Sequence, residues 1–155
     1  MRFFGTNGDN VANPCIQCRR NTRPSIFDND ALYLRFSQSS SFLSGASDYF
    51  WGLQASGGPV VDEADSEIQI SGAGVGNAST EGMSATVRIF RPGAASFQKT
   101  AIWFGSGRTG TPLSWSVNGG GGLLANTDAI DGARFLFVTD NIATGYYAVR
   151  AYRFT

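Results

Sequence analysis

Two cysteines, Cys15 and Cys18, stand at the spacing shared by zinc-binding and redox-active motifs. A structural zinc site needs a full set of nitrogen or sulfur ligands, and the chain has no further cysteine and no histidine. A thioredoxin-like redox pair belongs to a β-α-β unit, which the sequence does not show. We therefore predict two free thiols, and we leave open their redox state and a zinc ion shared between chains.

A glycine-rich segment, Gly105-Ser-Gly-Arg-Thr-Gly110, matches the G-x-G-x-x-G pattern of dinucleotide-binding loops. In those proteins the glycine loop opens a helix whose N-terminus holds the phosphates. Here residues 111–115 have the pattern of a turn followed by a strand, so we predict a flexible inter-strand loop. No other segment indicates a cofactor, and we predict none.

The acidic residues gather at one place, between Asp62 and Glu67. Hard cations such as calcium bind several carboxylate and carbonyl oxygens, and Asp62, Asp65 and Glu67 could supply some of them, although the spacing is not that of an EF-hand. A solvated loop, or carboxylates that pair with arginines across an interface, is the alternative to calcium. Paired carboxylates also serve glycoside hydrolysis, which no other feature supports.

The absence of histidine excludes the Ser-His-Asp and Cys-His mechanisms within this chain. It also removes the commonest general base and the commonest metal ligand. Together with the motifs above, this predicts a protein that is not an enzyme.

The composition favours a protein that is packed against other subunits. Charged residues make up 15% of the chain, against a norm of about 25%, so a monomer would be poorly protected from self-association. Lys99 is the only lysine, and arginine is the cation preferred at interfaces. The 12 basic and 12 acidic residues cancel, which argues against nucleic-acid binding.

The sequence carries no sign of a membrane segment. No apolar run approaches the roughly 18 residues that a membrane span needs, and the first residues lack the apolar region of a secretion signal. We therefore predict no membrane contact and a cytoplasmic location until a particle is released.

Alternating apolar and polar residues indicate strands from residue 31 onward, separated by glycine-rich turns at 56–59, 72–77, 105–110 and 118–122. The alternation covers residues 31–37, 49–53, 67–71, 85–89, 113–117, 134–139 and 145–154, and residues 100–104 are almost continuously apolar. A chain of 155 residues suits one domain. We predict an all-β fold, a jelly-roll-like antiparallel β-sandwich of about eight strands that spans residues 31–155.

Large aromatic residues stand in or near these strands, namely Trp51, Trp103, Trp115, Tyr146, Tyr147 and Tyr152. We interpret aromatic side chains at alternating strand positions as core residues. The alternative is an exposed platform on which sugar rings stack.

Residues 1–30 form a different region, rich in asparagine and proline and without a sustained period. We predict an extended N-terminal arm, which either lies on its own domain or reaches a neighbouring subunit. Arginines outnumber acidic residues in it, and we expect them to pair with carboxylates of a partner. The predicted partner-binding residues are the arginines Arg2, Arg19, Arg20 and Arg23, with Phe3 and Phe4 as apolar anchors.

Several segments together resemble a module of bacteriophage virion proteins, either tail-fibre-like or capsid decoration proteins. They are Ile26-Phe-Asp-Asn-Asp-Ala-Leu-Tyr-Leu-Arg-Phe-Ser37, Ser44-Gly-Ala-Ser-Asp-Tyr-Phe-Trp51, Asp65-Ser-Glu-Ile-Gln-Ile70, Ala129-Ile-Asp-Gly-Ala-Arg-Phe-Leu-Phe137 and Asn141-Ile-Ala-Thr-Gly145 with the tyrosine-rich strand after it. The resemblance covers residues 26–155 and departs from the pattern before them, where the segment from Cys15 to Pro24 replaces a regular strand.

This resemblance implies a virion structural protein without catalytic residues. Combined with the composition, it predicts a capsid decoration (cement) protein, a homotrimer that binds the major capsid protein and stabilises the head. Such a protein would be assembled in the host cytoplasm and located on the capsid surface of the virion. The alternative is a tail-fibre or receptor-binding protein that contacts host surface glycans.

Overall fold

The computed structural model describes residues 10–12, 15–20, 30–55, 58–72, 74–75, 82–108, 115–137, 142–149 and 151–153. For some of these residues the structure describes the backbone and not the side chain. They are residues 10–12, 15–20, 63, 108, 115–118, 142–148 and 151–153. The regular structure in these residues is entirely β-strand, with no helix among them.

The strands form two sheets. The larger sheet contains β1 (Asn10–Ala12), β2 (Cys15–Arg20), β5 (Tyr49–Ala55), β6 (Gly58–Asp65), β8 (Met83–Phe90), β9 (Thr100–Arg108), β10 (Trp115–Leu124), β12 (Ile142–Ala148) and β13 (Ala151–Arg153). The smaller sheet contains β3 (Leu32–Gln38), β4 (Ser41–Phe42), β7 (Ile68–Gln69) and β11 (Gly132–Phe137).

All of these strand pairings are antiparallel. The larger sheet has the order β12-β2-β8-β9-β10-β5-β6, and β1 pairs with both β8 and β13. In the smaller sheet β3 pairs with β11, β4 and β7. Among the described strands, β6 is therefore one outer strand of the larger sheet.

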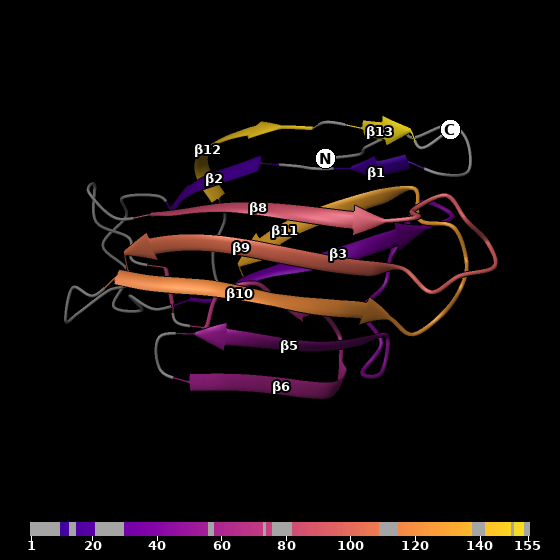
Figure 1. Cartoon of the computed structure of the whole chain (residues 1–155), viewed down its shortest axis with the longest axis horizontal. Helices are drawn as coiled ribbons and strands as arrows, with labels where there is room; N and C mark the ends of the chain where they lie inside the picture. Colours follow the sequence, from indigo (N-terminus) through magenta and orange to yellow (C-terminus); the bar gives the residue numbers. More distant parts are fainter. Residues whose placement is uncertain are drawn as a thin grey trace.

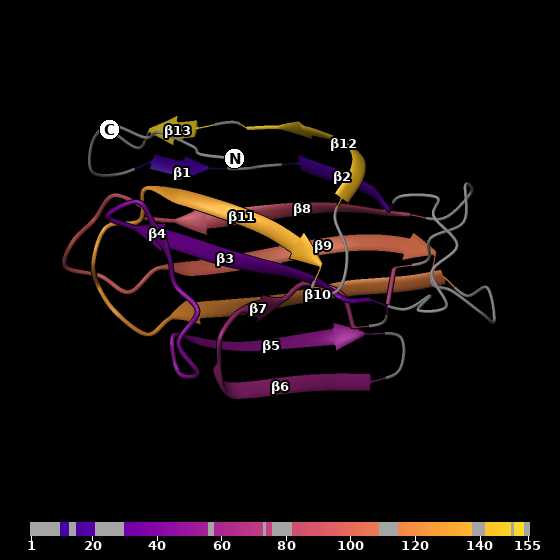
Figure 2. The same ribbon diagram turned by 180° about the vertical axis from the view of Figure 1, so that it is seen from behind.

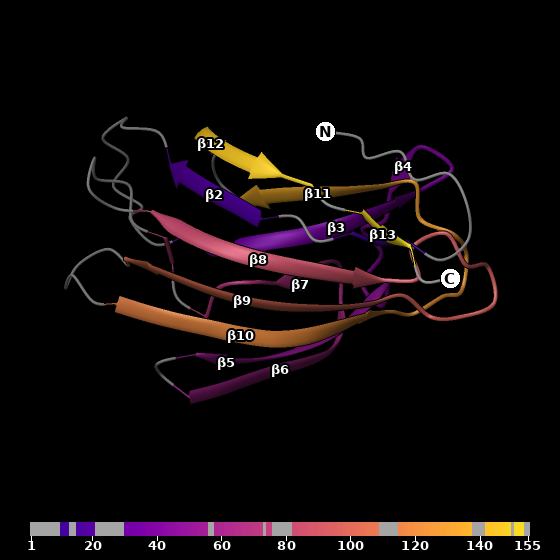
Figure 3. The ribbon, with the colours of Figure 1, turned by 45° about the horizontal axis from the view of Figure 1, so that its top comes forward.

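The two sheets pack face to face as a sandwich. The larger sheet lies in front in Figure 1, with β3 and β11 behind it, and Figure 2 shows the smaller sheet from the opposite side. The tilted view in Figure 3 again places β3 and β11 on the far side of β8, β9 and β10. The predicted all-β antiparallel sandwich is confirmed.

The core lies between the two sheets. Every second side chain of β5 and of β8 is buried there, because successive side chains of a strand point to opposite faces. The buried apolar residues are Leu32, Leu34, Phe36, Tyr49, Trp51, Leu53, Ala55, Ile68, Ile70, Val75, Met83, Ala85, Val87, Ile89, Ala101, Trp103, Leu124, Ala133 and Phe137. Burying each large apolar side chain contributes roughly 1.5–3 kcal/mol, so this cluster is the main source of stability.

A buried hydrogen bond ties the two sheets together. The hydroxyl oxygen of Tyr49 on β5 accepts a hydrogen bond from the backbone N–H of Phe36 on β3, at 2.8 Å. The two aromatic rings lie next to each other, with 6.0 Å between their centroids. The polar end of this tyrosine is thus satisfied inside the core.

Two glycines at the centre of β10 stand where a larger residue would meet its neighbours. A Cβ atom at Gly120 would lie 2.3 Å from the carbonyl oxygen of Gly52 and 2.7 Å from the indole ring of Trp103. A Cβ atom at Gly122 would lie 2.8 Å from the side chain of Ile68. Any other residue at these positions would force the neighbours to move.

The structure corrects several predicted turns. Residues 118–122 belong to the long central strand β10, and Gly105 to Arg108 belong to β9. Gly58 and Pro59 begin β6, which also contains the acidic residues Asp62, Glu63 and Asp65. Thirteen strands are described where about eight were expected, partly because strands of two or three residues are too short to show a period of alternation.

The described part of the predicted N-terminal arm is built into the larger sheet. Residues 10–12 form β1, and residues 15–20 form β2, which pairs with β8 on one side and β12 on the other. These residues are strands of the sandwich itself. The other residues of the predicted arm lie outside the described part of the chain.

Candidate functional site

The predicted partner-binding residues fall into two groups. Arg19 and Arg20 end β2, in register with Thr144 and Ile142 of β12. The others lie outside the described residues, namely Arg2, Phe3, Phe4 and Arg23. The structure therefore places Arg19 and Arg20 on a strand of the sandwich.

The two cysteines lie on β2 as well. Cys15 is in register with Thr86 of β8, and Cys18 is in register with Met83. Within the described side chains, no group of three or more acidic, cysteine or histidine residues could hold a metal ion.

The carboxylates of the acidic segment have separate partners. Asp65 accepts a hydrogen bond from the indole N–H of Trp51 at 3.0 Å, and Glu67 forms an ion pair with Arg35 at 2.8 Å. Asp62 accepts a hydrogen bond from the backbone of Ala64. Each of these carboxylates thus has its own partner within the chain.

Two of the predicted core aromatics can be assigned. Trp51 and Trp103 are both buried between the sheets, which confirms the core interpretation for these two residues. The side chains of Trp115, Tyr146, Tyr147 and Tyr152 lie outside the described set.

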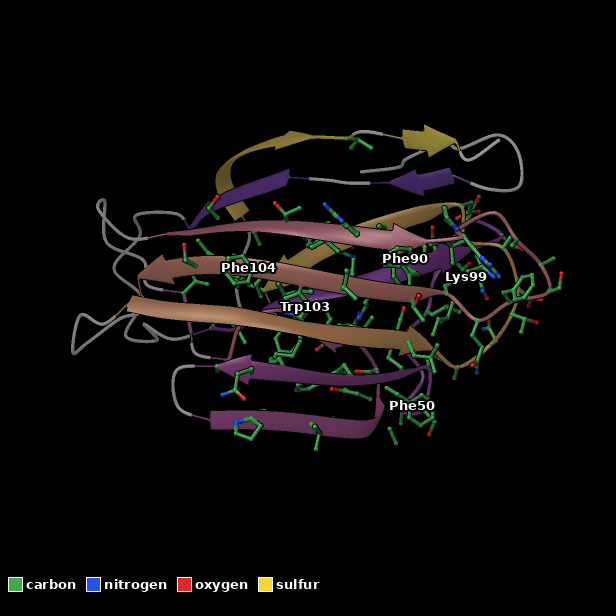
Figure 4. The ribbon with its side chains drawn as sticks, viewed as in Figure 1. Phe50, Phe90, Lys99, Trp103 and Phe104 are labelled. Atoms are coloured by element: carbon green, nitrogen blue, oxygen red, sulfur yellow. The ribbon has the colours of Figure 1, made fainter. Side chains whose placement is uncertain are left out.

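The first candidate surface is the outer face of the larger sheet, which we call the open face. It consists of the residues of β5, β8, β9 and β10 that point away from the smaller sheet, and no described strand covers it (Figure 1). Its exposed apolar residues include Phe104, Ile102 and Phe50, which are 67%, 45% and 39% exposed. Figure 4 shows that Phe104 and Phe50 lie towards opposite ends of this face.

Strand register sets the neighbours on the open face. Phe104 lies beside Thr86 on one side and Gly119 on the other. In the next row Ile102 lies beside Arg88 and Gly121. Among the described side chains that point outward here, Arg88 is the only charged one. Its single positive charge makes the surface weakly cationic.

The glycines of the open face are not required by packing. A Cβ atom at Gly121 would be 3.6 Å from its nearest neighbour, and one at Gly119 would be 3.4 Å away. Neither residue has a positive φ. Glycine in a strand lowers its stability and often marks the close approach of a ligand or another backbone.

The second candidate surface is one end of the sandwich, which we call the loop end. It consists of residues 38–43, 91–99 and 124–134. Lys99 is fully buried at its centre, beside Phe90 in Figure 4. Its ammonium group donates hydrogen bonds to the carbonyl oxygens of Ala94, of Phe97 at 2.6 Å and of Thr127 at 2.7 Å.

This ammonium group joins two loops that are distant in the sequence. Burial lowers the pKa of Lys99, and the carboxylate of Asp128 partly opposes that shift. The three carbonyl oxygens replace the water that a surface lysine would have. Lys99 therefore fixes loop 91–99 against loop 125–131.

Asp131 fixes the third part of the loop end. Ser39 and Ser40 connect β3 to β4 with φ angles of 50° and 69°, a left-handed conformation that asparagine and glycine adopt more easily. Asp131 accepts hydrogen bonds from the Ser37 hydroxyl at 2.5 Å and from the backbone N–H of Ser40 at 2.7 Å. The side chain thereby holds the turn in place.

Two arginines project from the loop end, each over a phenylalanine ring. The guanidinium carbon of Arg91 lies 4.2 Å from the centroid of Phe97. That of Arg134, two residues into β11, lies 5.7 Å from the centroid of Phe42. Cation–π contacts of this kind attract a guanidinium group to the face of the ring.

The loop end was not predicted from the sequence. One signal was present in the sequence. Lys99 stands two and four residues before Ala101 and Trp103, which are buried, so its side chain points to the same face of the strand. A lone lysine in phase with inward-facing residues indicates a buried cation that needs carbonyl partners. The contacts of Arg91 and Arg134 had no such signal, because they depend on loop conformation and on sheet register.

Comparisons with protein-family models, with curated proteins and with solved structures find no match for this chain. The described residues contain no helix of the length and apolar character needed to span a membrane.

Proposed function

We propose that this chain is a non-enzymatic structural protein of a bacteriophage particle, a capsid decoration (cement) protein that binds the major capsid protein. The observation that carries the proposal is the open face, where Ile102 and Phe104 are exposed two residues apart on the same side of β9. Contiguous exposed apolar surface is typical of protein–protein contacts, and aromatic residues and arginine are enriched at their centres.

A protein surface is the ligand that the open face suits best. Its described side chains combine the apolar residues Phe104, Ile102 and Phe50 with short hydroxyl side chains, one glutamine and one arginine. The glycines at 119 and 121 leave room for side chains of a partner. A flat apolar partner surface with a carboxylate near Arg88 is complementary to it.

The proposal includes a homotrimer on the capsid surface. In a symmetric particle, many copies of a small contact add up to a large stabilisation. Sedimentation of the isolated protein tests the trimer independently of its place on the particle.

The experiment that tests the function is to count and locate this chain in purified particles by imaging and quantitative mass spectrometry. Many copies spread over the head shell would support decoration. A small number at the tail would contradict it.

The contribution of the open face is tested by rebinding variants to particles stripped of this chain. Ile102→Asp with Phe104→Asp should abolish attachment, because charges would be buried against an apolar partner. Ala46→Asp, which adds a charge in the exposed turn between β4 and β5, is the control.

The second candidate function is a tail-fibre or receptor-binding protein that contacts host glycans. The observation that favours it is that Phe104 lies in one row with Thr86 and, across Gly119, with Gln54. An exposed ring flanked by hydrogen-bonding groups is a surface on which a sugar can stack. Binding of the isolated protein to glycans, together with no binding to bare capsids, would favour this function over decoration.

A further inference from the structure

The two arginines of the loop end share an unusual arrangement. Arg91 and Arg134 are both exposed, and each lies over a phenylalanine ring. They come from different strands, since Arg91 follows the end of β8 and Arg134 stands near the start of β11. Figures 1 and 2 show that these two points lie at the same end of the sandwich.

Neither guanidinium group forms an ion pair with a described residue. The ion pair found within the described residues joins Arg35 and Glu67. A guanidinium group that is stacked on a ring keeps its N–H edge free for a further partner. That edge is a planar fork that fits the two oxygens of a carboxylate.

The platform that carries these arginines is held rigidly. Lys99 fixes the loop of Arg91 through carbonyls on both sides of the loop end. Gln38 and Asn126 donate hydrogen bonds to each other through their side-chain amides, at 2.6 and 3.1 Å. Binding to a rigid platform loses less conformational entropy than ordering free loops.

The backbone at Arg91 is strained. Its φ angle is 51°, a left-handed conformation that is costly for a residue with a Cβ atom, and it precedes Pro92, which disfavours helical conformations still further. Glycine would fit this position without the steric cost. An arginine in a strained conformation, with its guanidinium group directed to the surface, is the pattern of a residue kept for binding.

We propose that the loop end is a contact surface for an acidic segment of a neighbouring protein, whose carboxylates bind Arg91 and Arg134. The inference rests on the proposed function for the place of that neighbour, since a protein that bridges two capsid subunits needs a second contact surface besides the open face. It assigns the pairing with carboxylates, which was expected of the arm, to different arginines.

Charge favours a protein over a nucleic acid as the partner. The chain has no net charge, and the exposed acidic residue Asp128 belongs to the same loop end. A nucleic-acid backbone needs a dense set of cations, whereas two separated guanidinium groups suit individual carboxylates.

Binding of the full-length protein to immobilised poly-L-glutamate tests the proposal without particles. The double variant Arg91→Gln with Arg134→Gln should bind at least tenfold more weakly than the wild type. Arg91→Lys with Arg134→Lys should fall in between, because lysine keeps the charge but not the planar fork. Arg108→Gln, which removes an arginine at the last residue of β9, is the matched control and should bind as the wild type does.

Two results would overturn the proposal. One is binding of poly-L-glutamate that is equal in the wild type and the Gln double variant, with thermal unfolding showing that both are folded. The other is tighter binding to polyphosphate than to poly-L-glutamate, which would assign the arginines to a phosphate ligand. Because this assay contains no particles, its result is separate from that of the localisation experiment, and either proposal can fail alone.

Discussion

The two faces of the larger sheet are built from the same strands and obey different constraints. Trp103 and Phe104 are consecutive residues of β9, yet the first is 4% exposed and the second 67% exposed. Gly120 and Gly121 are consecutive residues of β10, yet a Cβ atom would clash at the first and fit at the second. The inner residues are determined by packing, whereas the outer residues are not.

This difference separates folding from function within one sheet. An apolar residue on the inner face is explained by burial against the smaller sheet. Phe104 is 67% exposed and gains little from burial in the isolated chain, and an exposed aromatic residue favours association. The open face is therefore where a binding role should be sought.

The largest expected effect comes from truncating the neighbouring aromatics of β9. Trp103→Ala should lower the free energy of unfolding by about 3–5 kcal/mol, because it leaves a cavity in the core. Phe104→Ala should change it by less than about 0.5 kcal/mol, as is usual for exposed positions. Urea unfolding of the two variants measures both values, and equal losses would contradict the assignment of the two faces.

A control for this pair uses the polar atom of Trp103. Its indole N–H is buried and has no acceptor among the described residues. Trp103→Phe should therefore cost much less than Trp103→Ala, since no hydrogen bond is lost and most of the ring volume remains.

The next effect concerns the adjacent glycines of β10. Gly120→Ala should destabilise the protein by about 2–3 kcal/mol or more, because its Cβ atom meets a backbone oxygen that cannot move freely. Gly121→Ala should leave stability unchanged or raise it by up to about 1 kcal/mol, through lower backbone entropy in the unfolded chain. Thermal unfolding of the pair provides the comparison, and a destabilising Gly121→Ala would show that the outer glycine is also structural.

The sequence predicted the alternating part of the fold well. Alternation of apolar and polar residues identified the strands around Leu34, Trp51 and Val87, because a strand covered on one face shows a period of two. Gly119 to Gly122 were predicted as a turn and lie in a central strand. Glycine runs are usually turn signals, and only the packing of Trp103 and Ile68 against the inner glycines requires them in the sheet.

The candidate site was much harder to predict. Partner binding was expected from the arginines of the first 30 residues, on the basis of composition. The contact of Arg134 with Phe42 depends on the register of β11, β3 and β4, which no local pattern encodes. The position of Arg91 depends on a loop held by Lys99. Both are products of tertiary structure.

Titration extends the comparison to two tyrosines. Burial raises the pKa of Tyr49 on the inner face far above its usual value, and burial, with Glu67 next, also raises the pKa of the half-buried Tyr33. Above pH 10 the unfolded chain loses these protons while the folded chain keeps them. Stability should then fall as pH rises, by about 1.4 kcal/mol per pH unit for each proton retained.

The measurement is urea unfolding between pH 9 and pH 11.5. Tyr49→Phe should make the fall with pH less steep, although it lowers stability at neutral pH because the hydrogen bond from Phe36 is lost. Tyr33→Phe should reduce the slope less. An unchanged slope in Tyr49→Phe would contradict burial as the cause of its raised pKa.

The smallest expected effect concerns Arg91, and it tests whether an outward-facing residue can lower the free energy of unfolding. Arg91→Ala and Arg91→Gly both remove the contact with Phe97, but only glycine relieves the strain of a φ angle of 51°. The Gly variant should therefore be more stable than the Ala variant by about 1 kcal/mol. Both should lose binding to poly-L-glutamate to the same degree, because neither has a guanidinium group.

This pair separates the two roles of Arg91. If the Gly variant is at least as stable as the wild type and binds more weakly, the arginine lowers the stability of the fold and serves recognition, as the comparison of the two faces predicts. Equal stability of the Ala and Gly variants would mean that the backbone at this position is not strained. The backbone conformation at Arg91 would then follow from the turn at Pro92 alone. Arg91 would resemble the other exposed residues in having little effect on the stability of the fold.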